Sequence, residues 1–275
     1  MDGSLDEAAV RLSVVIDGRL DAARARQVAT LTGRLGLAGI WLRYPWWPLR
    51  GTATGETDRA GLLAAAALGV RVPPGLVVDA DAADPGDPWI TGLPAGLRVA
   101  LAGAPPAIAR WRDLLGQRPE LAVTQLALPA GGGSVTAAAA VFVPCAPGRD
   151  LAGAVSAAAA AASGRPVLAE VTVSVGRTAA EARARADADE LFTLAGHPAR
   201  QGLFGTLEEC QATAARLAHA GATELVCYLP LASDLPDVLA QLRSIAIGAG
   251  MLRPGEPPSA APPPPAGWGG RRFMA

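Results

Sequence analysis

Two strand-and-helix units between residues 165 and 246 constrain the fold of this chain more than any other feature. Val167 to Val175 and Glu224 to Leu229 are short apolar stretches rich in β-branched residues and leucine, which predict buried strands. Each is followed by a turn and then by a segment with helical character. Strands and helices that alternate in this way are typical of a β/α protein with parallel strands.

The helices of these units have well-marked starts. Thr178-x-x-Glu181 and Thr206-x-x-Glu209 both have capping-box spacing. In such a box the hydroxyl accepts a hydrogen bond from a backbone amide, and the glutamate reaches back to accept from another. The spacing therefore predicts helices that begin at residues 178 and 206.

The same alternation extends over most of the chain. Strands are predicted at residues 11–17, 39–44, the second half of 70–79, 97–101, 121–128, 139–143, 167–175 and 224–229. Helices are predicted at residues 20–35, 60–68, 106–115, 150–162, 178–194, 206–220 and 235–247. Eight strands separated mostly by helices favour a (β/α)8 TIM-like barrel over an open doubly wound sheet, and such a barrel typically takes about 250 residues.

Composition divides the chain into three parts. Residues 1–10 form an N-terminal extension, residues 11–250 a single barrel domain, and residues 251–275 a proline-rich tail that we expect to be disordered. The first residues lack the apolar core of a secretory signal, and no apolar run is long enough for a membrane span. We therefore expect a cytoplasmic protein with no membrane partner.

The chain contains no lysine, which excludes Schiff-base chemistry and a Walker-type phosphate lysine. Any fixed cation must be an arginine. A net charge of -1 gives no basic surface for nucleic acid. The three cysteines form no CxxC pair, and the two histidines lack a carboxylate motif, so no metal site is predicted.

Several motifs resemble those of the bacterial luciferase-like, flavin-dependent monooxygenases and their deazaflavin-dependent reductase relatives. The motifs are GRTAAEARARADAD from Gly176, GLFGTLEEC from Gly202, HAGATELVCYLP from His219 and, more loosely, LGLAGIWLRYPWW from Leu35. The resemblance covers residues 139–247 well and residues 11–79 more weakly. It implies an oxidoreductase that uses FMN or a deazaflavin (coenzyme F420) to act on a small organic substrate.

The chain also departs from that family at the rim of the predicted site. The family commonly has an acidic residue or a histidine just after the second strand, where this chain has Arg43, Tyr44, Pro45 and Trp46. The insertion that usually covers the substrate is absent or very short. These departures leave a second interpretation open, in which the chain is a non-catalytic barrel that serves as a structural or regulatory subunit of a catalytic partner. Either role is compatible with a homodimer or with a heterodimer of two barrels.

Site residues are expected at the carboxyl ends of the strands, where barrel enzymes have their active sites. This directs attention to Asp17, Trp41 to Trp47, Asp79, Gly103, Cys145 to Arg149, and Ser174 to Arg177. The candidates for cofactor binding are Trp46, Gly103, Arg149, Arg177, Gly205 and Thr206, and those for catalysis are Tyr44 and His197.

Each candidate also has a simpler structural interpretation. Trp46 and Trp47 either stack on the flavin ring or line a substrate pocket, or they form an apolar plug over the barrel. Arg149 and Arg177 either bind the cofactor phosphate or point into solvent. Gly205 and Thr206 either bind an anion at a helix start or only cap that helix.

Overall fold

The computed structural model describes residues 10–16, 22–44, 74–86, 96–119, 123, 125–129, 139–145, 150–189, 192, 202–230 and 234–252. Its strands are β1 (Arg11–Ile16), β2 (Gly39–Tyr44), β3 (Gly75–Asp79), β4 (Arg98–Ala102), β5 (Gln125–Pro129), β6 (Ala140–Val143), β7 (Val167–Val175), β8 (Gly202–Gly205) and β9 (Glu224–Tyr228). Its helices are α1 (Ala22–Arg34), α3 (Pro105–Gly116), α4 (Leu151–Ala162), α5 (Ala179–Asp187), α7 (Leu207–His219) and α8 (Leu235–Gly248).

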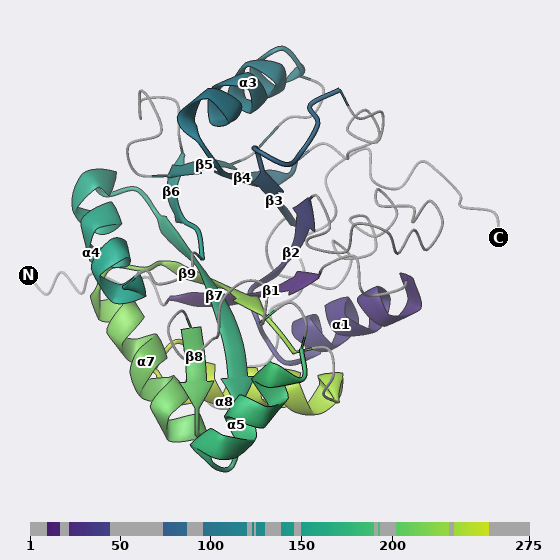
Figure 1. Cartoon of the computed structure of the whole chain (residues 1–275), viewed down its shortest axis with the longest axis vertical. Helices are drawn as coiled ribbons and strands as arrows, with labels where there is room; N and C mark the ends of the chain where they lie inside the picture. The colour runs from purple at the N-terminus through teal and green to yellow at the C-terminus, as the bar shows by residue number, and fades with distance from the viewer. Residues whose placement is uncertain are drawn as a thin grey trace, which may run out of the picture.

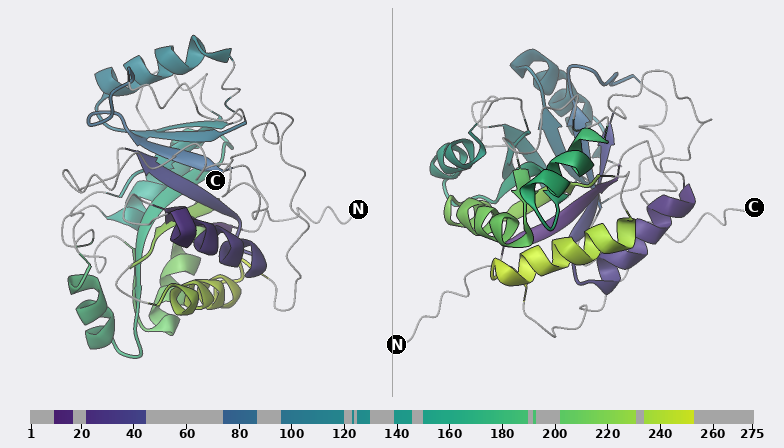
Figure 2. Two further views of the ribbon diagram at one scale, coloured as in Figure 1. Left: turned by 90° about the vertical axis from the view of Figure 1, so that its right-hand side faces the viewer. Right: turned by 60° about the horizontal axis from the view of Figure 1, so that its bottom comes forward.

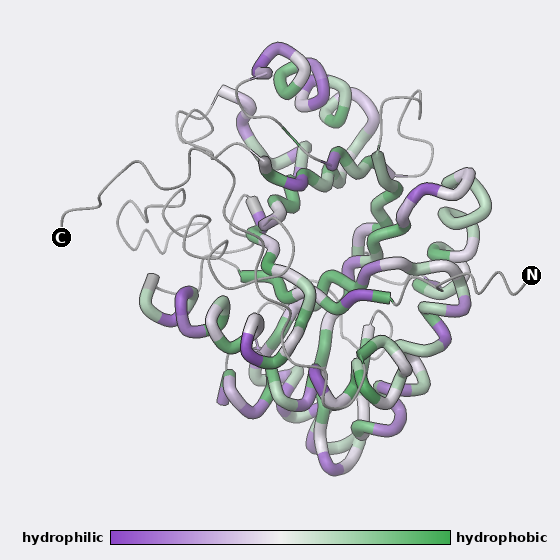
Figure 3. The backbone as a smooth tube through the Cα atoms, turned by 180° about the vertical axis from the view of Figure 1, so that it is seen from behind, coloured by the Kyte–Doolittle hydropathy of each residue, from purple (hydrophilic) through white to green (hydrophobic). Residues whose placement is uncertain are grey.

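Eight of the strands close into a parallel barrel. Strands β1 to β7 pair in chain order, and β9 joins β7 to β1 and so completes the ring. Helices surround this ring, as Figure 1 shows, and the view from behind in Figure 3 shows the strands around the barrel axis. The predicted (β/α)8 fold is confirmed.

Strand β7 is longer than its neighbours and continues beyond the barrel. Its first half pairs with β6 and β9, and residues Thr172 to Val175 pair with β8. The sequence analysis missed β8, because its four residues, GLFG, are half glycine and too short for a strand pattern. Figure 2 shows the long β7 running toward α5 in the side view.

Most predicted boundaries agree with the structure within two residues. The fifth strand begins at Gln125 instead of residue 121, and α5 ends at Asp187 instead of residue 194. The predicted helix at 60–68 and nearly all of the proline-rich tail lie outside the described residues. None of the helices that the structure describes combines the length and apolarity needed to cross a bilayer.

Both predicted threonine caps form, and the capping box at Thr206 is complete. The Thr206 hydroxyl accepts from the Glu209 amide, and the Glu209 carboxylate accepts from the Thr206 amide at 2.7 Å. The Thr178 hydroxyl accepts from the Glu181 amide in the same way, but the Glu181 carboxylate accepts from the amide of Arg177. These bonds satisfy backbone amides that have no partner within the helix.

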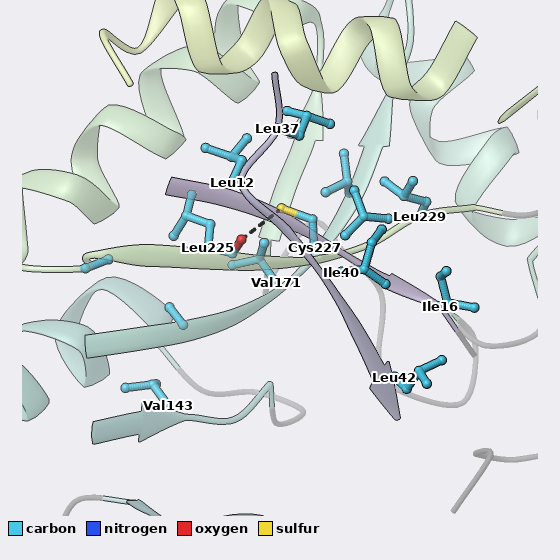
Figure 4. Close-up of a cluster of buried hydrophobic side chains, with 14 of the residues drawn as sticks. Leu12, Ile16, Leu37, Ile40, Leu42, Val143, Val171, Leu225, Cys227 and Leu229 are labelled. Carbon is cyan, nitrogen blue, oxygen red and sulfur yellow. Dashed lines mark hydrogen bonds between the residues drawn. The ribbon is translucent and has the colours of Figure 1, made fainter. Parts of the chain in front are cut away.

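Apolar side chains form two separate shells, one between barrel and helices and one inside the barrel. On β7, Val171 and Val173 face the helices, whereas Leu168 faces the interior. Figure 4 shows part of the outer shell, where β1, β2 and β9 contribute leucine, isoleucine and Cys227 side chains. This alternation is what a closed barrel requires of each strand.

The amino-terminal end of the barrel interior is filled by a buried ion pair. The two terminal guanidinium nitrogens of Arg98, Nη1 and Nη2, donate to the Glu224 carboxylate at 2.7 and 2.8 Å. Ser13 and the indole of Trp41 donate to the same carboxylate at 2.6 and 2.9 Å. The sequence analysis placed Trp41 among the residues at the carboxyl ends of the strands. Its side chain instead lies beside Glu224, toward the amino-terminal end of the barrel interior. Its ring fits there because Gly75 is its neighbour on β3.

We expect Glu224→Ala to lower the free energy of unfolding by about 3–5 kcal/mol, because it leaves the buried Arg98 guanidinium without its carboxylate. Denaturant unfolding followed by circular dichroism measures this loss. The matched control is Glu208→Ala, which removes an exposed carboxylate and should change stability by about 0.5 kcal/mol or less. Equal losses in the two variants would contradict the role given to Glu224.

Candidate active site at the carboxyl end of the barrel

A second ion pair lies inside the barrel at its carboxyl end. Arg43 on β2 donates to Glu170 on β7 at 2.6 Å and to the Tyr228 hydroxyl on β9 at 2.7 Å. The Tyr228 hydroxyl donates to the same Glu170 oxygen at 2.5 Å. Asp79 is the last residue of β3, and its carboxylate oxygen Oδ2 lies 3.9 Å from Nη2 of Arg43. We call Arg43, Glu170, Thr172 and Tyr228 the upper layer.

Glu170 connects the upper layer to β6 as well. Its second carboxylate oxygen accepts from the backbone amide of Cys145 at 2.9 Å. Both oxygens are therefore hydrogen-bonded, as a buried carboxylate requires, and the Glu170 side chain is only 1% exposed. The Arg43 side chain is 14% exposed and the Asp79 side chain is 25% exposed. Solvent therefore contacts the upper layer on the side where these two residues lie.

The surroundings of these groups shift their pKa values. Burial raises the pKa of Tyr228 well above its ordinary value, and Glu170 adds to this although Arg43 opposes it. Burial lowers the pKa of Arg43, but Tyr228, Glu170 and Asp79 more than offset this and the net pKa is raised. Tyr228 is thus a neutral phenol at physiological pH, and Arg43 is a permanent cation.

Thr172 completes the layer as a neighbour of Tyr228. The two residues are register partners on β7 and β9, and strand alternation puts Thr172 on the same face as Glu170. The threonine is 2% exposed. Within the described part of the chain, its hydroxyl has no hydrogen-bond partner.

Three predicted cofactor-binding residues, Arg177, Gly205 and Thr206, lie near one another at the ends of β7 and β8. The amide of Gly176, next to Arg177, donates to the carbonyl of Gly205 at 2.9 Å, which joins the ends of β7 and β8. The Arg177 side chain is 92% exposed and contacts Glu181 at 3.2 Å. Thr206 caps α7. The described contacts are therefore those of helix starts, and a role in cofactor binding stays a prediction for all three residues.

Gly103 has a local structural reason to be glycine. It follows β4 with a φ of 134°, and a Cβ there would lie 2.8 Å from a carboxylate oxygen of Asp81. That carboxylate accepts from the Ala104 amide at 2.8 Å. The turn lies at the carboxyl end of β4, and a role for Gly103 in cofactor binding stays a prediction.

The remaining predicted site residues lie outside the described part of the structure. They are Asp17, residues 45–47 with Trp46, residues 146–149 with Arg149, His197 and the side chain of Tyr44. Among the described residues, no group of three or more His, Cys, Asp or Glu side chains is arranged to hold a metal ion.

The sequence analysis did not select Glu170, Thr172 or Tyr228. A signal for them was present, because Glu170 and Thr172 interrupt the apolar strand VLAEVTVSV at alternate positions. A charge in the middle of a buried parallel strand must have a partner. Arg43 was included in the strand-end range Trp41 to Trp47 and was noted as a departure from the family pattern, but no role was predicted for it. Its partner Glu170 lies on a distant strand and accounts for a buried arginine at this position.

Comparison with known proteins finds likeness in structure and none in sequence. No protein-family model matches the chain, and no curated protein matches it. Many solved structures match the chain, and three of them match over 86–88% of it, with the match covering 92–99% of each of the three. An F420-dependent secondary alcohol dehydrogenase matches with a TM-score of 0.64 and 11% identity. The coenzyme F420 dependent tetrahydromethanopterin reductase from Methanopyrus kandleri and a riboflavin lyase with modified FMN each match with a TM-score of 0.57 and 12% identity.

This confirms the luciferase-like resemblance at the level of the fold. The chain has the same barrel as F420-dependent and flavin-using enzymes, and it spans nearly their whole length. At 11–12% identity, the likeness does not assign the function of any residue in those proteins to a residue of this chain.

The contact with Glu170 gives Cys145 a testable property. Burial, together with Glu170, raises the pKa of the Cys145 thiol to about 12, although Arg43 opposes the shift. Iodoacetamide should therefore label Cys145 at pH 8 roughly a thousand-fold more slowly than free cysteine, because the thiolate is the reactive form. The rate should still rise at pH 10, and peptide mass spectrometry measures it.

Glu170→Gln removes one cause of the shift and should accelerate the labelling of Cys145. Cys210 in the same sample is the internal control, since its pKa is raised by burial and by Glu209 and does not involve Glu170. A labelling rate at Cys145 that levels off below pH 9 would contradict the assignment.

Proposed function

We propose that this chain is a flavin- or deazaflavin-dependent oxidoreductase that acts on a small organic substrate. The observation that carries the proposal is the upper layer, in which Arg43, Glu170 and Tyr228 form a buried network at the carboxyl end of a closed parallel barrel. Barrel enzymes place their chemistry at this end. Buried and perturbed ionisable groups in such a position are typical of functional sites.

The fold of the neighbours supports the choice of cofactor class. Two of the similar structures are named as F420-dependent enzymes, and the third contains modified FMN. The glycine turn at the end of β4 allows the backbone to approach a ligand closely, which fits a flavin-type ring at this end of the barrel.

The chain itself would bind and orient the cofactor. In this proposal Trp46 and Gly103 contact the ring, and Arg149 and Arg177 bind the phosphate together with the backbone of Gly205 and Thr206. Arg177 would have to exchange its contact with Glu181, and its exposed side chain is free to rotate. Tyr44 and His197 are the proposed proton donors or acceptors. The bound cofactor supplies hydride transfer, or oxygen chemistry in a monooxygenase, while the protein excludes water.

We expect the purified protein to bind FMN or coenzyme F420 with a dissociation constant in the micromolar range. Separate titrations of each compound, followed by quenching of cofactor fluorescence, measure the affinity and show which compound is preferred. Riboflavin, which lacks the phosphate, is the matched ligand control for FMN and should bind more weakly. Failure of both cofactors to bind would contradict the proposal and would favour a non-catalytic subunit.

Trp46→Ala should weaken cofactor binding about ten-fold, which corresponds to loss of a stacking contact of about 1–1.5 kcal/mol. Trp268→Ala is the matched control, because it removes a tryptophan from the proline-rich tail. Isothermal titration calorimetry is the suitable measurement, since both changes alter the protein fluorescence. Equal affinities in the two variants would remove Trp46 from the cofactor site.

A further inference from the structure

Thr172 contributes a buried hydroxyl group to the upper layer. Within the described residues its hydroxyl is buried without a partner, whereas both Glu170 oxygens and the Tyr228 hydroxyl are hydrogen-bonded. A buried hydroxyl without a partner costs about 1–3 kcal/mol. Such a cost is explained when the hydroxyl binds a ligand atom.

The charges of the layer restrict what that ligand can be. Arg43 is already paired with Glu170 at 2.6 Å, and the Asp79 carboxylate lies 3.9 Å away. The described ion pairs of Arg43 thus join one cation to two anions, Glu170 and Asp79. An anionic ligand group would have to compete with Glu170 for Arg43 and would be repelled by both carboxylates. A neutral group meets no such penalty.

The neutral donors and acceptors of the layer lie side by side. Thr172 and Tyr228 are register partners on adjacent strands, and the Tyr228 hydroxyl accepts only one described hydrogen bond, from Arg43. A phenol oxygen has two lone pairs, so it can accept a second hydrogen bond, and the threonine hydroxyl both donates and accepts. A hydroxyl, carbonyl or amide group on the ligand matches this pair.

We propose that the upper layer recognises an uncharged oxygen-bearing group of the substrate, such as an alcohol, a ketone or an amide, through Thr172. The inference rests on the proposed oxidoreductase function and adds the substrate class to it. It excludes carboxylates and phosphate esters as the group bound at this point. Thr172 is a specificity-determining residue in this proposal, and Glu170 and Arg43 are positioning residues that hold Tyr228.

The substrate class is tested with matched neutral and anionic probes on the wild-type protein. Isobutyramide with isobutyrate and benzamide with benzoate are pairs of nearly equal shape, and cyclohexanone represents ketones. Saturation-transfer NMR should give binding for the amides and the ketone and at least ten-fold weaker binding for the carboxylates. Equal binding of the two members of each pair would overturn the proposal.

The role of Thr172 is tested with Thr172→Val and Thr172→Ser. Thr172→Val should weaken binding of the neutral probes about five-fold, as expected for one hydrogen bond of about 1 kcal/mol, and Thr172→Ser should restore it. The melting temperature of Thr172→Val should stay equal or rise, because the variant removes a buried hydroxyl that lacks a partner. A merely structural threonine would instead lower the melting temperature and leave probe affinity unchanged, which overturns the proposal.

Ser174→Ala is the matched control on the same strand. The Ser174 hydroxyl donates to the Ala182 carbonyl at 2.7 Å, so this variant should lose stability and keep its affinity for the probes.

FMN and F420 titrations of Thr172→Val separate this proposal from the proposed function. Unchanged cofactor affinity with weaker probe binding supports Thr172 as a substrate contact, and the reverse pattern overturns that role. Failure of the wild type to bind either cofactor contradicts only the oxidoreductase function.

Discussion

The structure depends on the burial of charge inside a closed barrel. Eight parallel strands enclose an interior that must be filled by side chains, and this chain fills both ends of it with ion pairs. Arg98 and Glu224 occupy the amino-terminal end, and Arg43 and Glu170 occupy the carboxyl end. Burial removes each pair from water, and this loss of hydration is offset only when all charged groups make hydrogen bonds within the protein. Serine, tryptophan, tyrosine and backbone amides provide those bonds.

The two ion pairs differ in a way that relates to function. The pair of Arg98 and Glu224 is bidentate, and the Glu224 side chain is completely buried. We therefore assign this pair a role in stability. The upper pair has a partly exposed arginine, an additional carboxylate from Asp79 and an unpartnered hydroxyl beside it. Stability alone would favour an apolar residue in place of that hydroxyl. Polar groups retained at such a cost are common at functional sites.

Much of the fold could be predicted because the relevant signals are local. Apolar strands, capping boxes and glycine turns are each contained within a few residues, and together they gave the eight barrel strands and the starts of α5 and α7. Strand β8 was missed because it is formed by pairing with the end of β7 and its own sequence is weak. The candidate site likewise depends on contacts between residues that are far apart in the sequence. Arg43 and Glu170 are 127 positions apart, and no motif within either strand indicates the other.

The buried charges also explain why the strands pair in the observed register. Apolar alternation excludes a shift of one residue, which would turn the interior face of β7 toward the helices, but it allows a shift of two. A two-residue shift would move Glu170 by about 6.6 Å along the strand, beyond hydrogen-bond reach of Arg43 and the Cys145 amide. Glu224 fixes β9 against β4 and β1 in the same way. The residues that form the upper layer are therefore held in place by the same interactions that specify the barrel, so Thr172 and Tyr228 are positioned before any ligand binds.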